Sequence, residues 1–265
     1  MNTITRSTIA AAVGALLIGA SACSGGSDPA STGTTRPDKT TTTTAAEPLI
    51  DPGDGGRYRP AIEPSRFVKG IDNPYLPLKP GARWVYEGRS DGATERIEVV
   101  VTDETKTIEG IEAVVVRDTV TRDGVLFEDT TDWYAQDVDG NVWYLGEATE
   151  EHEDGKVSTA GSWETGVKGA QPGIAMPARP KVGRAYRQEF AKGEAEDVAK
   201  VLRLGRTADV PAGSYRDVVV IEEWNPFDPK VLEEKSFAPG VGLVLEVQTA
   251  GGKGRNQLVE FTPGA

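Results

Sequence analysis

Apolar and polar residues along the chain gather in short runs that are typical of β-strands. Residues 83–87 (RWVYE), 96–102 (RIEVVVT) and 113–117 (AVVVR) are rich in β-branched and aromatic side chains, which favour strands over helices. No stretch shows a convincing 3.6-residue apolar period. The nearest is residues 193–202, which fits either a helical face or a strand, and we favour a strand.

Glycine turns separate these runs at Gly92, Gly110, Gly124, Gly140 and Gly155, which are spaced 14 to 18 residues apart. This spacing favours a meander of long antiparallel strands. The pattern stops between residues 161 and 180, where glycine and proline are frequent. Because this segment still carries apolar residues, we expect a long loop that packs onto the domain.

The strongest hairpin signal lies in residues 129–147, where two Trp-Tyr pairs flank an Asp-Gly turn. The pairs are Trp133-Tyr134 and Trp143-Tyr144, and the turn is Asp139-Gly140. Adjacent strand residues point to opposite faces, so each pair places one aromatic ring on each side of the sheet. A two-residue turn and a five-residue loop give opposite registers, which leaves open which Trp shares a face with which Tyr. The outward rings need cover from the 161–180 loop or from a partner.

Three blocks of sequence recur in one order at an offset near 102 residues, as between Gly81 and Gly183 (183 − 81 = 102). Residues 78–86, 107–116 and 133–140 resemble residues 180–188, 210–220 and 236–242. The repeat predicts two similar halves, residues 76–160 and 178–262, in one antiparallel curved sheet or half-barrel with little helix. Chance similarity among glycine-punctuated strands is the alternative.

The N-terminus has the layout of an export signal: Arg6, an apolar run over residues 9–18, then small residues before Cys23. Residues 20–23 (ASAC) resemble a bacterial lipobox, although Ala20 occupies a position where Leu is more usual. We expect a signal peptide over residues 1–22 and a lipid (palmitate) on Cys23 that anchors the chain to the outer face of the cell membrane. The alternative is an ordinary secretory signal with an incidental cysteine.

Residues 23–60 contain few large apolar side chains and many Thr, Gly and Pro, which predicts a disordered tether. A single β-rich domain is expected over residues 61–265. The chain has a formal charge of −12, one His and one Cys. The absence of a basic patch argues against nucleic acid, and an anionic membrane would repel the domain, so membrane association depends on the anchor. A lone His and a lone Cys exclude His-cluster metal sites and most His-based relays.

Several motifs have two interpretations. Residues 137–141 (DVDGN) space oxygen ligands as a calcium loop does, but the run is too short for an EF-hand, and a turn capped by its own Asp side chains is favoured. A Glu/Asp pair near Glu164 and Glu189 would suit an envelope hydrolase, yet nothing in the sequence identifies a catalytic pair. His152 lies among acidic residues and reads as a surface residue. We predict no catalytic residue, no metal and no cofactor.

Five motifs resemble a group of uncharacterised bacterial secreted proteins and lipoproteins. They are DWYAQD (132–137), GNVWY (140–144), GSWE (161–164), PKVG with YRQE (180–189) and PGVGL (239–243). The resemblance covers roughly residues 73–247. It implies an extracytoplasmic β-rich domain of unknown function, and it carries no activity, cofactor or catalytic residue over to this chain.

These observations favour a non-enzymatic binding or interaction module at the cell envelope, for an apolar ligand or an envelope protein. An envelope hydrolase and a structural lipoprotein are the alternatives. The residues expected to contact a ligand or partner are Trp133, Tyr134, Trp143, Tyr144, Trp163 and Glu164. An uncharged apolar pocket would favour a carrier. A buried carboxylate of raised pKa in a deep pocket would favour an enzyme. A filled interior would favour an interaction module.

Overall fold

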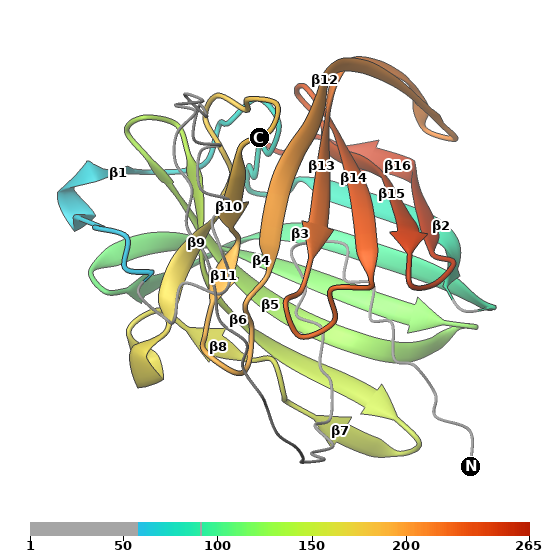
Figure 1. Ribbon diagram of the computed structural model, residues 1–265, viewed down its shortest axis with the longest axis horizontal. Helices are drawn as coiled ribbons and strands as arrows, with labels where there is room; N and C mark the ends of the chain where they lie inside the picture. Colours follow the sequence, from blue (N-terminus) through green and yellow to red (C-terminus); the bar gives the residue numbers. More distant parts are fainter. Residues whose placement is uncertain (1–57, 91) are drawn as a thin grey trace, which may run out of the picture.

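The computed structural model describes residues 58–90 and 92–265. This part of the chain forms one antiparallel sheet that nearly closes into a barrel (Figure 1). The predicted mainly-β fold with a single curved sheet is therefore confirmed. The predicted signal peptide, Cys23 and residues 24–57 of the predicted tether lie outside the described residues.

Two short 3₁₀ helices accompany the strands. They are η1 (Pro64–Arg66) and η2 (Val167–Gly169). The strands up to the end of the 161–180 segment are β1 (Phe67–Val68), β2 (Arg83–Ser90), β3 (Ala93–Ile108), β4 (Ile111–Arg122), β5 (Val125–Asp137), β6 (Val142–Glu153), β7 (Lys156–Ser158), β8 (Trp163–Glu164) and β9 (Gln171–Met176). Those that follow are β10 (Ala185–Arg187), β11 (Glu189–Phe190), β12 (Val198–Val210), β13 (Gly213–Trp224), β14 (Leu232–Ala238), β15 (Gly242–Ala250) and β16 (Arg255–Thr262).

The strand order around the sheet is β10-β12-β13-β14-β15-β16-β2-β3-β4-β5-β6-β9-β11. The C-terminal strand β16 pairs with β2, so the two halves of the chain join side by side (Figure 1). The two ends of this order, β10 and β11, are consecutive in sequence and are separated only by Gln188. The backbone N–H of Gln188 donates to the Asp197 carbonyl at 2.8 Å, which holds the closure in place.

The strands of the two halves follow the offset of the sequence repeat. β4 spans residues 111–122 and β13 spans 213–224, so both bounds differ by 102 (213 − 111 and 224 − 122). β3 and β12 end at residues 108 and 210, again 102 apart (210 − 108). This correspondence supports the predicted duplication, while the predicted domain bounds remain a prediction. Tyr58, within the predicted tether range, donates from its hydroxyl to the Pro172 carbonyl at 3.1 Å.

The segment 161–180 differs from the expected loop. Part of it forms β8 and β9, both of which pair with β6, so β9 is a member of the barrel wall. The expectation that the segment packs onto the domain is correct, because Trp163 and Met176 are buried in the main core. The strand predicted within residues 193–202 is present as the start of β12.

A second, smaller core lies on the outside of the barrel. Ile108, Ile111, Val115, Trp133 and Leu145 are buried there beneath Ile62, Phe67 and Trp143. The first residues of the described chain, including η1 and β1, therefore cover the outer face of strands β3 to β6. This cover explains how the hairpin can carry aromatic rings on both faces.

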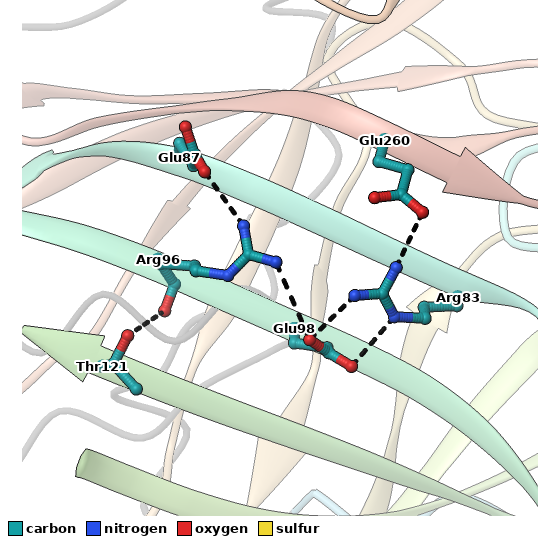
Figure 2. A network of polar contacts seen from close by, with 6 residues as sticks. All are labelled: Arg83, Glu87, Arg96, Glu98, Thr121 and Glu260. Atoms are coloured by element: carbon teal, nitrogen blue, oxygen red, sulfur yellow. Dashed lines mark hydrogen bonds and ion pairs between the residues drawn. The ribbon is translucent and has the colours of Figure 1, made fainter. Parts of the chain in front are cut away.

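A charged network occupies the outer face of strands β16, β2 and β3 (Figure 2). Arg83 makes two hydrogen bonds of 2.9 Å to Glu98 and a third of 2.9 Å to Glu260. Arg96 binds Glu87 at 2.9 Å and lies 4.0 Å from Glu98. Hydrogen bonding from Arg83 is the main cause that lowers the pKa of Glu98. These side chains are partly exposed, so each pair stabilises the fold by about 1 kcal/mol or less.

Candidate functional site

The β5–β6 hairpin sorts its four aromatic residues by face. Tyr134 pairs with Tyr144, and their rings stack inside the barrel with centroids 4.7 Å apart. A β-bulge shifts the register between Trp133 and Tyr134, so Trp133 lies opposite Gly146. Both tryptophans face outwards and both tyrosines face inwards. The structure thus resolves the register that the sequence left open.

The predicted contact residues that face outwards make contacts at the second, smaller core on the outside of the barrel. The Lys106 ammonium lies 3.2 Å from the centre of the Trp133 ring and donates to Glu164 at 2.7 Å. The Trp143 indole N–H donates to Asp137 at 2.8 Å, and its ring meets Phe67 edge-on. Trp133, Trp143 and Glu164 are therefore engaged in contacts within the domain.

Asp137 organises the hairpin turn. Its carboxylate accepts hydrogen bonds of 2.9 Å from the backbone N–H groups of Asp139 and Asn141 and from the Asn141 side chain. Burial acts to raise the pKa of Asp137, but these hydrogen bonds and that from Trp143 outweigh it, and the net shift is downward. The turn interpretation of residues 137–141 is confirmed.

The barrel interior contains a cavity of ≈ 40 Å³ beside Tyr134. Most of its lining is aliphatic or aromatic, and an ion pair stands in its wall. The lining residues are Leu76, Leu78, Trp84, Tyr86, Val99, Val116, Tyr134, Ala175, Glu223, Lys235, Phe237, Gly242 and Leu243. The volume suffices for about three or four water molecules, since each needs roughly 10–15 Å³.

Residues 69–82, which connect β1 to β2, contribute two of the lining side chains, Leu76 and Leu78. Asn73 anchors this segment: its backbone N–H donates to Gln136 at 2.8 Å, and its side chain donates to the Gly140 carbonyl at 2.9 Å. The Pro74 carbonyl accepts from the Gly240 N–H at 2.7 Å. The segment therefore bridges the β5–β6 and β14–β15 turns, and we refer to residues 69–82 as the covering segment.

The ion pair in the cavity wall joins β13 and β14. The Lys235 ammonium is 2.6 Å from Glu223 and 3.6 Å from Glu246, and all three side chains are at least nine-tenths buried. Burial acts to lower the pKa of Lys235, but the charges of Glu223, Glu246 and Glu233 outweigh it and raise the pKa. Lys235 is thus a charged group in the interior. Gln188 also donates to Glu223 at 2.9 Å, which links the pair to the closure of the sheet.

Asp118 lies beyond the cavity on β4, two residues after Val116 on the same face. Its side chain is 1% exposed, and neither carboxylate oxygen has a hydrogen-bond partner among the described residues. Burial raises the pKa of Asp118 well above its usual range. The charges of Asp132, Glu128 and Glu246 raise it further, while Lys235 opposes them.

A second acidic group lies on β5 and β6, where Asp132 faces Glu147. The Tyr144 hydroxyl lies 2.5 Å from Asp132 Oδ1 and 3.0 Å from Glu147 Oε2. A hydroxyl has one proton to donate, so one of the two carboxyl groups must carry a proton and donate to the Tyr144 oxygen. Burial is the main cause that raises the pKa of both carboxyl groups. Burial therefore favours the protonated form of these acids.

The structure divides the six predicted contact residues. Tyr134, Tyr144 and Trp163 lie in the main core, and of these Tyr134 lines the cavity. Of the two residues suggested for a hydrolase, Glu164 binds Lys106, whereas Glu189 is fully buried, and burial and then the charges of Asp197 and Glu147 raise its pKa well above the usual range. His152 is partly exposed, 3.7 Å from Glu150.

Sequence reasoning missed Lys235, Glu223 and Asp118. For Asp118 a signal was present, because in β4 it falls in phase with the inward residues Val114, Val116 and Val120. A charged residue in phase with apolar positions of a strand must be buried.

Across residues 58–90 and 92–265, no three Asp, Glu, His or Cys side chains are grouped so that they could hold a metal ion. Within the same ranges, no helix has the length and apolar character needed to cross a membrane.

No protein-family model matches the chain, and no curated protein matches it. Two solved structures are similar to it. One is a proposed exported protein with a YmcC-like fold from Bacteroides fragilis, with 14% identity and a TM-score of 0.42 over 71% of this chain and 99% of the other. The second is a proposed lipoprotein from Parabacteroides distasonis, with 13% identity and a TM-score of 0.39 over 71% of this chain and 98% of the other. Likeness at this level says nothing about a ligand or an activity.

Proposed function

We propose that this chain is a cell-envelope lipoprotein whose barrel binds a small, largely apolar ligand without catalysis. The observation that carries the proposal is the interior cavity. It is lined by aromatic and aliphatic side chains with a few convergent polar groups, which is the usual composition of a ligand site. The export signal and Cys23 in the sequence support the location and the lipid anchor.

The size of the cavity limits how a ligand can enter. Pockets for drug-sized ligands measure about 300–1,000 Å³, whereas this cavity measures ≈ 40 Å³. A ligand larger than a few water molecules therefore has to displace part of the lining. The covering segment is the natural part to move, because it has no regular secondary structure and its Leu76 is only half-buried.

Native mass spectrometry of residues 24–265, secreted by the native host and purified without detergent, tests the proposal. We expect a reproducible adduct that is lost on denaturation and that organic extraction can identify. A mass equal to that of the bare chain under every native condition would overturn ligand binding, and cross-linking would then be used to search for an envelope partner.

A matched pair of variants tests whether the cavity is the site. Val99 lines the cavity, and Val100 is the next residue on β3 and faces the outside. Val99→Phe fills the cavity and should abolish the adduct, whereas Val100→Phe should leave it unchanged. An adduct that survives Val99→Phe in a folded protein would place the ligand elsewhere.

A further inference from the structure

Two buried polar groups in this part of the barrel interior have no hydrogen-bond partner among the described residues. One is the Asp118 carboxyl group, and the other is the Tyr134 hydroxyl, in a residue that is 2% exposed. Tyr134 lines the cavity, and Asp118 follows the lining residue Val116 on the same face of β4. Buried polar atoms almost always have a partner, so these two unpartnered groups, one lining the cavity and one further along the same face of β4, suit a polar occupant.

The charged groups around the cavity indicate the sign of the charge on the molecule that would occupy it. Asp118 faces Asp132 and Glu128 on β5, Glu246 on β15 and Lys235 on β14. The only cation in this set is already bound, because Lys235 lies 2.6 Å from Glu223. The surroundings thus offer carboxyl groups in excess and no free positive charge to an incoming ligand.

Aromatic rings add to the preference for a positive charge. Trp84, Tyr86 and Tyr134 line the cavity, and the faces of such rings attract cations. The Tyr86 hydroxyl donates to the Leu243 carbonyl at 3.0 Å, so its ring is fixed in place. The remaining lining, such as Leu76, Phe237 and Leu243, suits an apolar body.

Resting on the proposed ligand-binding function, we propose that the ligand is an organic cation, an apolar molecule that carries an ammonium group. Asp118 accepts hydrogen bonds from the ammonium, the Tyr134 hydroxyl is within the same polar end of the site, and the apolar body lies towards the covering segment. An anionic head group would instead have to separate Lys235 from Glu223 and would face the surrounding carboxyl groups.

Binding of a cation by Asp118 should release a proton. Burial, together with Asp132, Glu128 and Glu246, favours the protonated form of Asp118 in the free protein, and Lys235 opposes them. The Tyr86 hydroxyl on β2 also faces this group. A bound ammonium favours the ionised carboxylate, so affinity should rise with pH as less proton has to be displaced.

The test compares three probes with the same eight-carbon chain, octylammonium, octanol and octanoate, by calorimetry on residues 24–265. We expect octylammonium to bind at least about tenfold more tightly than octanol, with octanoate weakest. Asp118→Asn keeps the size of the side chain but removes its charge. It should weaken octylammonium about tenfold and leave octanol unchanged.

Two further readouts separate this role from a structural one. The octylammonium affinity of the unaltered chain should rise with pH, and that of octanol should not. Asp129→Asn is the matched control, because Asp129 lies on the outer face of β5 and binds Arg117 at 2.9 Å. If Asp118→Asn does not fold, Glu246→Gln provides the second variant, with a smaller loss expected for octylammonium alone.

Each outcome has a distinct meaning. Equal affinity for octylammonium and octanol, with no effect of Asp118→Asn or Glu246→Gln, would show that the ligand is not a cation. The proposal that the cavity binds an apolar ligand would still hold. If octanoate binds most tightly, the proposed cation is wrong and the ligand is an anion that binds Lys235. Failure of all three probes to bind, together with a bare mass from the native host, overturns the proposed function itself.

Discussion

At the scale of single residues, Lys235 has the largest expected effect on stability. Its removal leaves the Glu223 and Glu246 carboxyl groups buried without their cation. Breaking a buried ion pair from one side usually costs about 3–5 kcal/mol. We expect Lys235→Met to lower the free energy of unfolding by that amount, measured by urea denaturation.

The partly exposed Arg83 provides the contrast. Arg83→Met removes two ion pairs, as Lys235→Met does, yet it should cost about 1 kcal/mol or less, because water already solvates the partners. Adding Glu223→Gln to Lys235→Met should recover part of the loss. Equal costs for Lys235→Met and Arg83→Met would show that the interior pair is solvated.

Glu128 makes stability depend on pH. Burial raises its pKa from 4.5 to about 7. The folded protein therefore keeps a proton that the unfolded chain releases near pH 4.5, so the contribution of Glu128 to stability is greatest below that pH and is lost as pH rises towards 7. The slope from this group reaches about 1.4 kcal/mol per pH unit. We expect Glu128→Gln to flatten the fall in unfolding free energy over this window.

Glu98 serves as the control of opposite sign. Its pKa is lowered, first by the hydrogen bonds from Arg83. Its contribution is present above the unfolded pKa and is lost as pH falls, so Glu98→Gln should not alter the decline between pH 4.5 and 7. A stability profile that rises with pH in the unaltered chain would contradict protonated acids in the interior.

At the scale of elements, the β5–β6 turn depends on Asp137. Asp137→Ala removes hydrogen bonds to Asp139, Asn141 and Trp143. With these donors left unpaired, we expect a loss of about 2–3 kcal/mol in chemical denaturation. Asp139→Ala removes only an ion pair to Arg66 whose side chains are 51% and 67% exposed, and should cost less than about 1 kcal/mol. Similar losses from the two variants would refute the turn role.

The same hairpin shows how far sequence reasoning reaches. Trp-Tyr pairs and an Asp-Gly turn predicted the strands and the presence of aromatic rings on both faces. The faces themselves depended on the bulge between Trp133 and Tyr134, whose partner strand contains Gly146 at φ +139°. A bulge changes which residues point inwards, and local preferences do not specify it.

The segment that contains β9 shows a second limit. Its sequence, QPGIAM, holds a proline and a glycine, both poor strand formers. It becomes a strand because it pairs with β6 on one side and β11 on the other. Such pairing is a tertiary effect, and a reading of local propensity assigns this segment to a loop.

The inward charges Glu223 and Lys235 were likewise fixed by the register of β13 and β14.

At the scale of the whole molecule, closure depends on a close approach between β9 and the β10–β11 junction. A Cβ atom at Gly173 would lie 2.0 Å from the Gln188 carbonyl oxygen and 2.7 Å from the Glu189 nitrogen. The backbone of Gln188 and Glu189 cannot yield as a flexible side chain would. Gly173→Ala should therefore separate β9 from β11 and open the barrel at this seam.

We expect this variant to lose about 3 kcal/mol of stability, the upper end for overpacking. The same change should accelerate hydrogen exchange at the amides of β9 and β11 ahead of those of β3 and β4. Gly155→Ala is the control: Gly155 has φ +73° in an exposed turn with open space around it, so its cost is confined to about 1–2 kcal/mol of backbone strain. Because Gln188 also binds Glu223 in the cavity wall, an opened seam should weaken ligand binding together with stability. If the Gly173→Ala variant shows the same hydrogen exchange and the same ligand affinity as the unaltered chain, contacts at this seam do not hold the barrel closed around its site.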